Sequence, residues 1–236
     1  MMKHGTLYLI PSLLGESPVA KVIPAFNMNI IRTLRYFIVE ELRTARRFLK
    51  QIYPDIDINS IQFLINNEHS TGHDQSLCIE PLLSGSDTGL LSEAGMPCVA
   101  DPGAEIVKLA HDHNIKVVPL IGASSLLLSL MASGFNGQNF VFHGYLPIDK
   151  ISRIKKIREI EKSVYTNNQT QIFIEAPYRN IQLFQAIIES CSENTRLCIA
   201  TDLTMESEVI KIQTIRNWKG KQPEIHKKPT VFLLYK

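Results

Sequence analysis

The sequence predicts an α/β fold, because short apolar runs alternate with amphipathic helical patterns along its 236 residues. Parallel strands need long crossover connections, and the helical patterns between the apolar runs supply them. The chain is 44% apolar and 20% charged, which is typical of a packed protein rather than a disordered one. Its formal net charge is only +2, so any contact with nucleic acid would have to come from local basic patches.

The first half of the chain predicts strands and helices in alternation. Strands are predicted at 6–12, 35–40, 61–66, 87–92 and 115–122. Helices are predicted at 41–53, 105–114 and 123–134, and a further helix-like segment begins near Ser76. The helix at 123–134 ends at Gly134, because glycine readily adopts the left-handed backbone angles that terminate helices. This alternation is typical of a parallel sheet covered by helices.

After Gly134 the pattern restarts and becomes richer in strands. Strands are predicted at 139–147, 170–177, 196–204, 207–215 and 229–236, and helices at 149–162 and 178–191. Neighbouring strands without a helix between them favour a mixed or antiparallel sheet. The sequence therefore predicts two α/β domains, residues 1–118 and residues 119–236.

Small residues gather in three loops that follow predicted strands. The loops are 11–15 (PSLLG), 90–103 (LLSEAGMPCVADPG) and 119–125 (PLIGASS). In an open α/β sheet, ligands bind at the carboxyl ends of the strands, and small side chains let backbone groups approach a ligand closely. A tight turn explains any single loop equally well, but three together favour a cleft for a large, mostly neutral ligand with a flat ring.

The sequence lacks the common phosphate- and zinc-binding motifs, GxGxxG, GxxxxGK[ST] and HExxH. His111 and His113 are two residues apart on a predicted helix and point in different directions, so they make a poor pair of metal ligands and no metal is predicted. The four cysteines form no CxxC pair, which indicates reduced thiols rather than a disulfide framework.

The longest apolar segment, IGASSLLLSLMASGF, is too short for a membrane span. It has about 15 residues, several of them serine or glycine, whereas a spanning helix needs ~20 apolar residues. We therefore expect no membrane contact and a cytoplasmic protein.

Several short motifs follow one another in a specific order along nearly the whole chain. They are LYLIPSLLG (7–15), EELRTARRFL (40–49), NEHS (67–70), LLSEAGMPCVADPG (90–103), VVPLIGASS (117–125), HGYLP (143–147) and IEAPYRN (174–180). Each motif alone is weak, but their order and spacing resemble the tetrapyrrole (corrin/porphyrin) methylase superfamily. Within it they are most similar to the branch that 2′-O-methylates a cytidine of small-subunit ribosomal RNA.

The resemblance implies a methyltransferase that uses S-adenosyl-L-methionine, built from two α/β domains and assembled as a homodimer. The cofactor would lie in the cleft between the domains, with the first domain supplying cofactor loops and the substrate side, and the second completing the cofactor site. The cofactor-binding residues carried over from the family are Pro11, Ala94, Gly95, Met96, Val99, Ser124, Ser125, Glu175, Leu203 and Thr230.

Methyl transfer from a sulfonium donor needs alignment more than a catalytic triad, because the donor already carries the activation. A ribose hydroxyl would still have to lose its proton, which calls for a carboxylate or a histidine near the cleft. The candidates lie in the matched motifs, and each could instead be an ordinary surface residue. They are Glu40, Glu68, His69 and Glu93.

Basic residues on two predicted helices are the candidates for RNA contact, because such clusters bind phosphates without regard to sequence. They are Arg43, Arg46, Arg47 and Lys50 on the first helix, and Lys150, Arg153, Lys155, Lys156 and Arg158 on the second. Glu159 and Glu161 lie beside the second group, so a solvated helix face explains that group equally well.

Departures from the family leave the substrate open. The tetrapyrrole enzymes carry Gly-x-Gly-Pro-Gly-Asp where this chain has residues 11–15, and Gly-Asp-Pro where it has residues 95–97, which argues against a tetrapyrrole substrate. The RNA branch has Asp and Thr in place of Glu41 and Leu42, and Asp in place of Glu93. An RNA methyltransferase is the leading prediction. The alternatives are a methylase of a tetrapyrrole or other small molecule, and a non-catalytic member that binds the cofactor.

Overall fold

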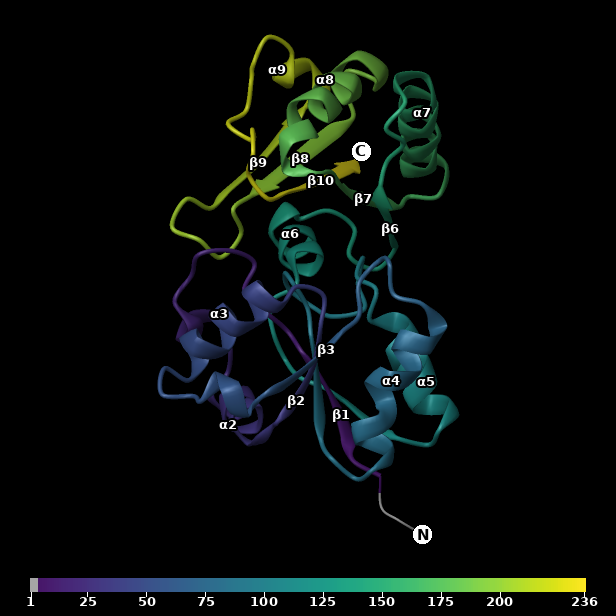
Figure 1. The fold of residues 1–236 in the computed structure, drawn as a ribbon. Helices are drawn as coiled ribbons and strands as arrows, with labels where there is room; N and C mark the ends of the chain where they lie inside the picture. The colour runs from purple at the N-terminus through teal and green to yellow at the C-terminus, as the bar shows by residue number, and fades with distance from the viewer. Residues whose placement is uncertain (1–3) are drawn as a thin grey trace. The chain divides into compact units, whose positions relative to one another are not determined.

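The computed structural model describes residues 4–236, which form two compact units; the first ends at Ala123 and the second begins at Ser124 (Figure 1). The first unit contains a five-stranded sheet in the order β3-β2-β4-β1-β5. All its neighbouring strands are parallel, as the alternating pattern predicts. The strands are β1 (Thr6–Ile10), β2 (Tyr36–Val39), β3 (Gln62–Ile65), β4 (Thr88–Leu91) and β5 (Lys116–Pro119).

Helices cover both faces of this sheet (Figure 1). On one face, Phe48 and Leu49 pack with Phe37 and Ile10 of the sheet; on the other, Ile106 packs with strand residues that point the opposite way. The first face carries α1 (Val19–Val22), α2 (Ala25–Thr33), α3 (Leu42–Ile52) and the short η1 (Ile58–Ser60). The second carries α4 (Gly72–Leu83) and α5 (Ala104–Asp112).

Four of these helical segments differ from the sequence predictions. The short segments α1 and η1 are absent from the predictions, and so is α2, whose first turn has no side chain that caps it and which follows Pro24. Helix α4 begins earlier than expected, at Gly72. Thr71 and Asp74 form a capping box there, in which each side chain binds the backbone N–H of the other residue.

The second unit contains a mixed five-stranded sheet in the order β6-β7-β10-β8-β9, which confirms the predicted mixed character. Strands β6 and β7 are parallel, and every other neighbouring pair is antiparallel. The strands are β6 (Phe140–Tyr145), β7 (Thr170–Ile174), β8 (Arg196–Thr201), β9 (Val209–Thr214) and β10 (Thr230–Tyr235).

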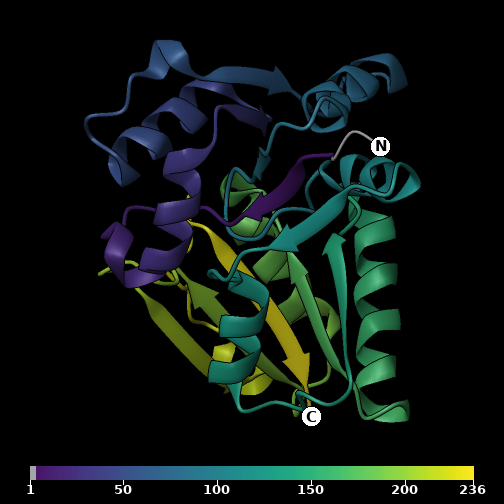
Figure 2. The same ribbon diagram turned by 90° about the horizontal axis from the view of Figure 1, so that it is seen from below.

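Three helices pack on one face of this sheet and one packs on the other. Phe232 and Leu234 of β10 face a core formed with α7 (Lys150–Thr166), α8 (Asn180–Ser190), which follows η2 (Pro177–Arg179), and α9 (Ile215–Trp218). The opposite face carries α6 (Ser125–Ser133), which crosses β9 and β10 (Figure 2). Helix α6 ends at Gly134, whose φ of 62° is left-handed, so the predicted stop is confirmed.

All four cysteines are free thiols, and three of them are buried. Burial raises the pKa of Cys78 to about 11 and that of Cys198 to about 12, so neither forms a thiolate near neutral pH. Among residues 4–236 no helix is both long enough and apolar enough to cross a membrane.

Candidate active site

The three small-residue loops meet at one edge of the first sheet. Strands β4, β1 and β5 are neighbours and parallel, so the chain leaves all three at the same edge. The Ser12 N–H donates a hydrogen bond to the Gly95 carbonyl over 2.9 Å, which joins the first loop to the second. A side chain on Gly122 would place its Cβ 2.3 Å from that of Pro11, so the third loop touches the first as well. We call this group of loops, residues 11–15, 92–103 and 120–123, the three-loop edge.

Gly95 lies at the centre of the three-loop edge. Its φ is +75°, a conformation that disfavours any residue with a Cβ. A Cβ there would lie 2.9 Å from Leu14 Cδ2 and 3.3 Å from the Ala123 carbonyl oxygen. The position therefore needs glycine both for its backbone angle and because the other two loops occupy the space beside it.

Asp101 fixes the far end of the second loop. Its Oδ1 accepts hydrogen bonds from the N–H groups of Gly103, over 2.8 Å, and Cys98, over 3.2 Å. Within this loop Cys98 and Ala100 both have positive φ, at 67° and 57°. Non-glycine residues hold such angles only where their surroundings fix them, and strained loops of this kind often occur at functional sites.

Glu40 follows β2 and lies beside Asp101 because β2 and β4 are neighbours in the sheet. Burial raises the pKa of Glu40 to about 7, and the Asp101 carboxylate adds to the rise through repulsion and a hydrogen bond between the two side chains. The charges of Glu93 and Glu68 contribute smaller increases. A carboxyl group that titrates near neutral pH is suited to accept a proton during catalysis.

Asn66, at the end of β3, reaches across the same edge. Its side-chain amide donates to the Pro102 carbonyl over 3.2 Å, and its backbone N–H donates to the Val39 carbonyl next to Glu40. The Asn66 Oδ1 is buried and accepts no hydrogen bond from the described residues. A buried acceptor without a donor costs free energy, which makes this atom a candidate ligand contact.

The other predicted catalytic residues differ in their surroundings. Glu68 and His69 are strongly exposed, and the His69 Nε2 lies 3.5 Å from the Glu68 Oε1. Among residues 4–236 neither side chain has another hydrogen-bond or ion-pair partner that would fix its orientation. Glu93 is half-buried and close enough to Glu40 to raise its pKa. Of the four candidates, Glu40 is the one that combines partial burial with a hydrogen bond to a second carboxylate, that of Asp101.

The predicted cofactor-binding residues of the first unit all lie in the three-loop edge. Pro11 and Gly95 are buried, Met96 is half-buried, and Ala94 and Val99 are exposed. Ser124 and Ser125 begin the second unit, where the Ser124 hydroxyl accepts from the Leu127 N–H over 3.4 Å and caps α6.

The predicted cofactor-binding residues of the second unit share one edge of its sheet. Glu175 directly follows β7, Thr230 begins β10, and Leu203 lies two residues after β8. Because β10 is antiparallel to both β7 and β8, the start of β10 meets the ends of the other two strands. The Thr230 hydroxyl approaches that of Thr201 on the neighbouring strand, at 3.4 Å.

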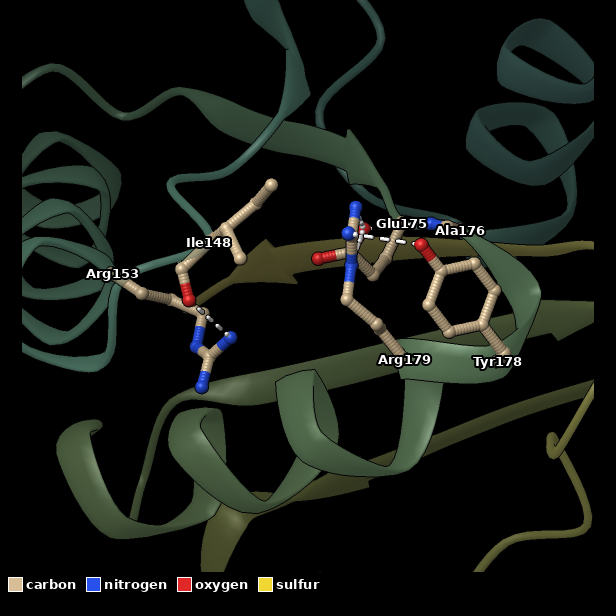
Figure 3. Close-up of polar contacts among 6 residues, drawn as sticks. All are labelled: Ile148, Arg153, Glu175, Ala176, Tyr178 and Arg179. Atoms are coloured by element: carbon tan, nitrogen blue, oxygen red, sulfur yellow. Dashed lines mark hydrogen bonds and ion pairs between the residues drawn. The ribbon is translucent and has the colours of Figure 1, made fainter.

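One carboxylate oxygen of Glu175 accepts three hydrogen bonds, and the other accepts none from the described residues (Figure 3). Oε1 accepts from the Arg179 side chain, with Nη2 at 2.6 Å and Nε at 2.9 Å, and from the Ala176 N–H at 2.7 Å. Oε2 is buried and has no hydrogen-bond donor among residues 4–236. Glu175 is therefore held in place and keeps one acceptor available for a ligand.

Arg153 was counted in the sequence as part of a solvated basic face, but the structure buries it, leaving 7% of it exposed. Its Nη1 donates to the Ile148 carbonyl over 3.3 Å (Figure 3), and its Nε has no partner within the described chain. Glu161, taken as a solvated neighbour, is buried too and accepts from the Ser192 N–H over 2.6 Å. Helix α7 turns both side chains toward its unit's interior.

The remaining candidate RNA-contact residues fall into two groups, those whose side chains have partners among the described residues and those whose side chains do not. Lys50 donates to the Pro54 and Ile56 carbonyls, and Lys156 pairs with Glu159 at 3.6 Å. Arg46 stacks on the Phe63 ring with its guanidinium carbon 5.7 Å from the centroid. The residues that are exposed and make none of these contacts are Arg43, Arg47, Lys150, Lys155 and Arg158.

Comparison with known proteins identifies the family. A sequence profile of the tetrapyrrole (corrin/porphyrin) methylases matches residues 28–218. The chain belongs to this family. The matched range includes the second and third loops of the three-loop edge and Glu40, and it extends through most of the second unit. The predicted membership of the tetrapyrrole methylases is thereby confirmed.

The chain is similar to curated members of the family that carry one name, ribosomal RNA small subunit methyltransferase I. The Bacillus subtilis protein is 32% identical over 206 residues, which are 86% of this chain and 65% of that protein. The protein from Buchnera aphidicola subsp. Acyrthosiphon pisum is 29% identical over 217 residues, 91% of this chain and 73% of that protein. This chain thus spans 65% of the length of the first relative and 73% of the second.

Solved tetrapyrrole methylases share the fold. The crystal structure of uroporphyrin-III C-methyltransferase from Thermus thermophilus, complexed with S-adenosylhomocysteine, gives a TM-score of 0.58 at 14% identity. The match covers 98% of each chain. At this identity the likeness concerns the fold, and it confirms the predicted α/β class of the tetrapyrrole methylase type.

Proposed function

We propose that this protein is a methyltransferase that uses S-adenosyl-L-methionine and methylates RNA of the small ribosomal subunit. The observation that carries the proposal is the three-loop edge, where backbone groups of three strand-end loops converge in a member of the tetrapyrrole methylase family. The name shared by the two relatives described above supports RNA as the substrate class. When bound, S-adenosyl-L-methionine supplies a methyl group that is already activated for transfer.

The residues present fit this ligand. The three-loop edge offers small side chains and backbone groups, which suits a ligand with a flat adenine ring and little net charge. Glu175 offers a fixed, buried acceptor in Oε2, which suits a hydroxyl or amino donor. We assign binding of the methyl donor to the residues predicted for it, namely Pro11, Ala94, Gly95, Met96, Val99, Ser124, Ser125, Glu175, Leu203 and Thr230.

We assign the role of general base to Glu40. A hydroxyl acceptor must lose its proton as it attacks, and Glu40 titrates near neutral pH, where it can take that proton. Asp101, held by two backbone N–H groups, keeps the Glu40 carboxyl group beside it and favours its protonated form once the proton has been taken. Alignment of the acceptor supplies the rest of the rate enhancement.

Three finer assignments belong to the same proposal. We propose that the protein acts as a homodimer and works in the cytoplasm. We also propose that exposed basic residues on α3 and α7 contact the RNA backbone, with Arg43, Arg47, Lys155 and Arg158 as the main contributors and Arg46 and Lys156 as minor ones.

S-adenosylhomocysteine should stabilise the protein against heat. A ligand that binds only the folded state adds about 2.7 kcal/mol when present at ~100 times its dissociation constant. For a chain of this size we expect a rise in Tm of about 5 to 10 °C. Differential scanning fluorimetry with S-adenosylhomocysteine, with adenosine as the comparison compound, measures this. A Tm that does not move in millimolar ligand would contradict the proposed methyl donor.

Transfer of a labelled methyl group to different acceptors identifies the substrate class. Protein incubated with S-adenosyl-L-methionine labelled in its methyl group should transfer label to unmodified small-subunit ribosomal RNA transcribed in vitro. Large-subunit RNA and a protein-free extract of small molecules are the parallel acceptors. Label confined to the small-molecule extract would instead identify a small-molecule methylase, and binding of the donor without any transfer would identify a non-catalytic member.

A further inference from the structure

A cavity of about 250 Å³ lies beside the three-loop edge, within the first unit. Its walls come from α3, from the loop after β1 and from the end of β4 with the residues that follow. Thr44, Arg47 and Gln51 of α3 line it at a spacing of three and four residues, so they project from one stripe of the helix. We call this space the α3 cavity.

The α3 cavity contains one free cation. Arg47 forms no hydrogen bond, ion pair or ring contact with the part of the chain that the structure describes. Its neighbours on the same helix differ: Lys50 is bound to two carbonyl groups, and Arg46 stacks on Phe63. An arginine fork that is unpaired at the rim of a cavity is suited to bind a phosphate group in two places at once.

The other walls match the remaining parts of a nucleotide. Phe48 and Leu13 provide apolar surface for a base, and the Thr44 hydroxyl and Gln51 amide can bond to its edge or to a ribose. Glu16 and Glu93 contribute carboxylate acceptors, which suit the hydroxyl and amino donors of a nucleoside. A space of this size admits a single unstacked nucleotide but not a duplex, and RNA is commonly read through such unstacked nucleotides.

The position of the α3 cavity connects it with the proposed chemistry. Ala94 belongs both to the cavity wall and to the loop assigned to the methyl donor. Glu93, also in the wall, is close enough to Glu40 to raise the pKa of that carboxyl group. A molecule in the cavity would therefore lie next to the donor loop and near the proposed base.

We propose that the α3 cavity binds the RNA nucleotide that accepts the methyl group, with Arg47 on its phosphate. This inference rests on the proposed function. Arg43 extends the positive charge along the exposed side of α3, outside the cavity, as expected if the RNA chain continues past the bound nucleotide.

Two substitutions test the α3 cavity in different ways. Arg47→Ala removes the cation, and Gln51→Phe fills the cavity without changing the charge. Each should lower kcat/KM for methylation of the small-subunit RNA transcript about ten- to a hundredfold. For Arg47→Ala this is the loss expected for one charged hydrogen bond, and for Gln51→Phe we expect a loss of the same size because the new ring occupies the space of the nucleotide. The dissociation constant of S-adenosylhomocysteine, measured by calorimetry, should stay within twofold of the parent value.

Each variant has a matched control. Arg43→Ala removes an unpaired arginine from the same helix but outside the cavity, and should lower kcat/KM only a few-fold. Gln62→Phe makes the same exchange as Gln51→Phe at an exposed site at the start of β3, the opposite end of that strand from the three-loop edge. Equal losses for Arg47→Ala and Arg43→Ala, or for Gln51→Phe and Gln62→Phe, would overturn the inference.

The experiments give different results if the inference fails and if the proposed function fails. If the parent protein binds S-adenosylhomocysteine and methylates the transcript while both cavity variants keep its kcat/KM, the α3 cavity is not the acceptor site, although the proposed function stands. If the parent itself transfers no methyl group to the transcript, the proposed function fails and the inference fails with it. Loss of S-adenosylhomocysteine binding in the cavity variants would also count against the inference, because the cavity would then serve the donor.

Discussion

Replacing Gly95 with alanine should abolish binding of S-adenosylhomocysteine at concentrations that saturate the parent protein. The new Cβ would lie 2.9 Å from Leu14 Cδ2 and 3.3 Å from the Ala123 carbonyl, so the first and third loops would have to move away. The hydrogen bond from the Ser12 N–H to the Gly95 carbonyl would be strained by the same movement. Isothermal titration calorimetry measures the loss directly.

Backbone strain must be separated from loss of the site, because alanine at φ +75° costs about 1–2 kcal/mol wherever it is placed. Gly220 provides the matched control: it has the same φ of +75°, and a Cβ there would meet nothing within 4 Å. We expect Gly220→Ala to lower Tm through this backbone strain alone and to bind S-adenosylhomocysteine like the parent. Normal binding by Gly95→Ala would show that the three-loop edge does not hold the methyl donor.

The convergence of the three loops could be predicted from the sequence because it follows from few assumptions. Once the first half is a parallel sheet, every loop after a strand lies at one edge, whatever the strand order. The pattern of small residues at 11–15, 90–103 and 119–125 then marks that edge. The contact between Ser12 and Gly95 needs one further fact, that β1 and β4 are neighbours, which the structure provides.

The pair formed by Glu40 and Asp101 could not be predicted, because the two residues lie far apart in sequence and meet only through the strand order. Sequence patterns placed Glu40 at the end of one predicted strand and Asp101 in the loop after another, but no pattern shows that β2 pairs with β4. The burial of Arg153 was missed for a related reason. In a helix as charged as α7, periodicity alone does not show which face packs inward, and a buried arginine runs against the usual preference.

The resemblance to the family predicted the ligand and the reaction, which composition and spacing alone could not. Composition and spacing favoured a large ligand with a flat ring, but they named neither the ligand nor the reaction. Neither the patterns nor the resemblance predicted the α3 cavity, since its walls come from separate segments and its lining includes Glu16 and Gln51, which lie outside the motifs. Side-chain geometry was needed to find it.

Replacing Glu40 with glutamine should lower kcat for RNA methylation about 10²- to 10⁴-fold, the usual contribution of a general base. The parent enzyme should follow the ionisation of this carboxyl group, whose pKa is about 7, so that kcat/KM rises about tenfold between pH 6 and pH 8. In Glu40→Gln the remaining activity should lose that dependence. Initial rates of methylation of the small-subunit RNA transcript, measured over a range of transcript concentrations across these pH values, give both effects.

Stability should change in the opposite direction to activity. The pKa of Glu40 is raised from 4.5 to about 7 on folding, so the folded state binds more protons than the unfolded state between these values. The charged carboxylate therefore destabilises the fold progressively as pH rises through that window, and glutamine removes this cost. We expect Glu40→Gln to have a higher Tm than the parent at pH 8 and a similar Tm at pH 4.5, with a modest difference because Glu40 is only half-buried.

A variant that is less active yet more stable at pH 8 would show that the carboxylate is kept for chemistry and not for the fold. Glu80→Gln, which neutralises an exposed carboxylate on α4, should change neither Tm nor kcat and serves as the control. If Glu40→Gln kept the parent's kcat and pH profile, the proton of the acceptor would have to leave by another route. Glu93, which lines the α3 cavity, would then be the next carboxylate to replace.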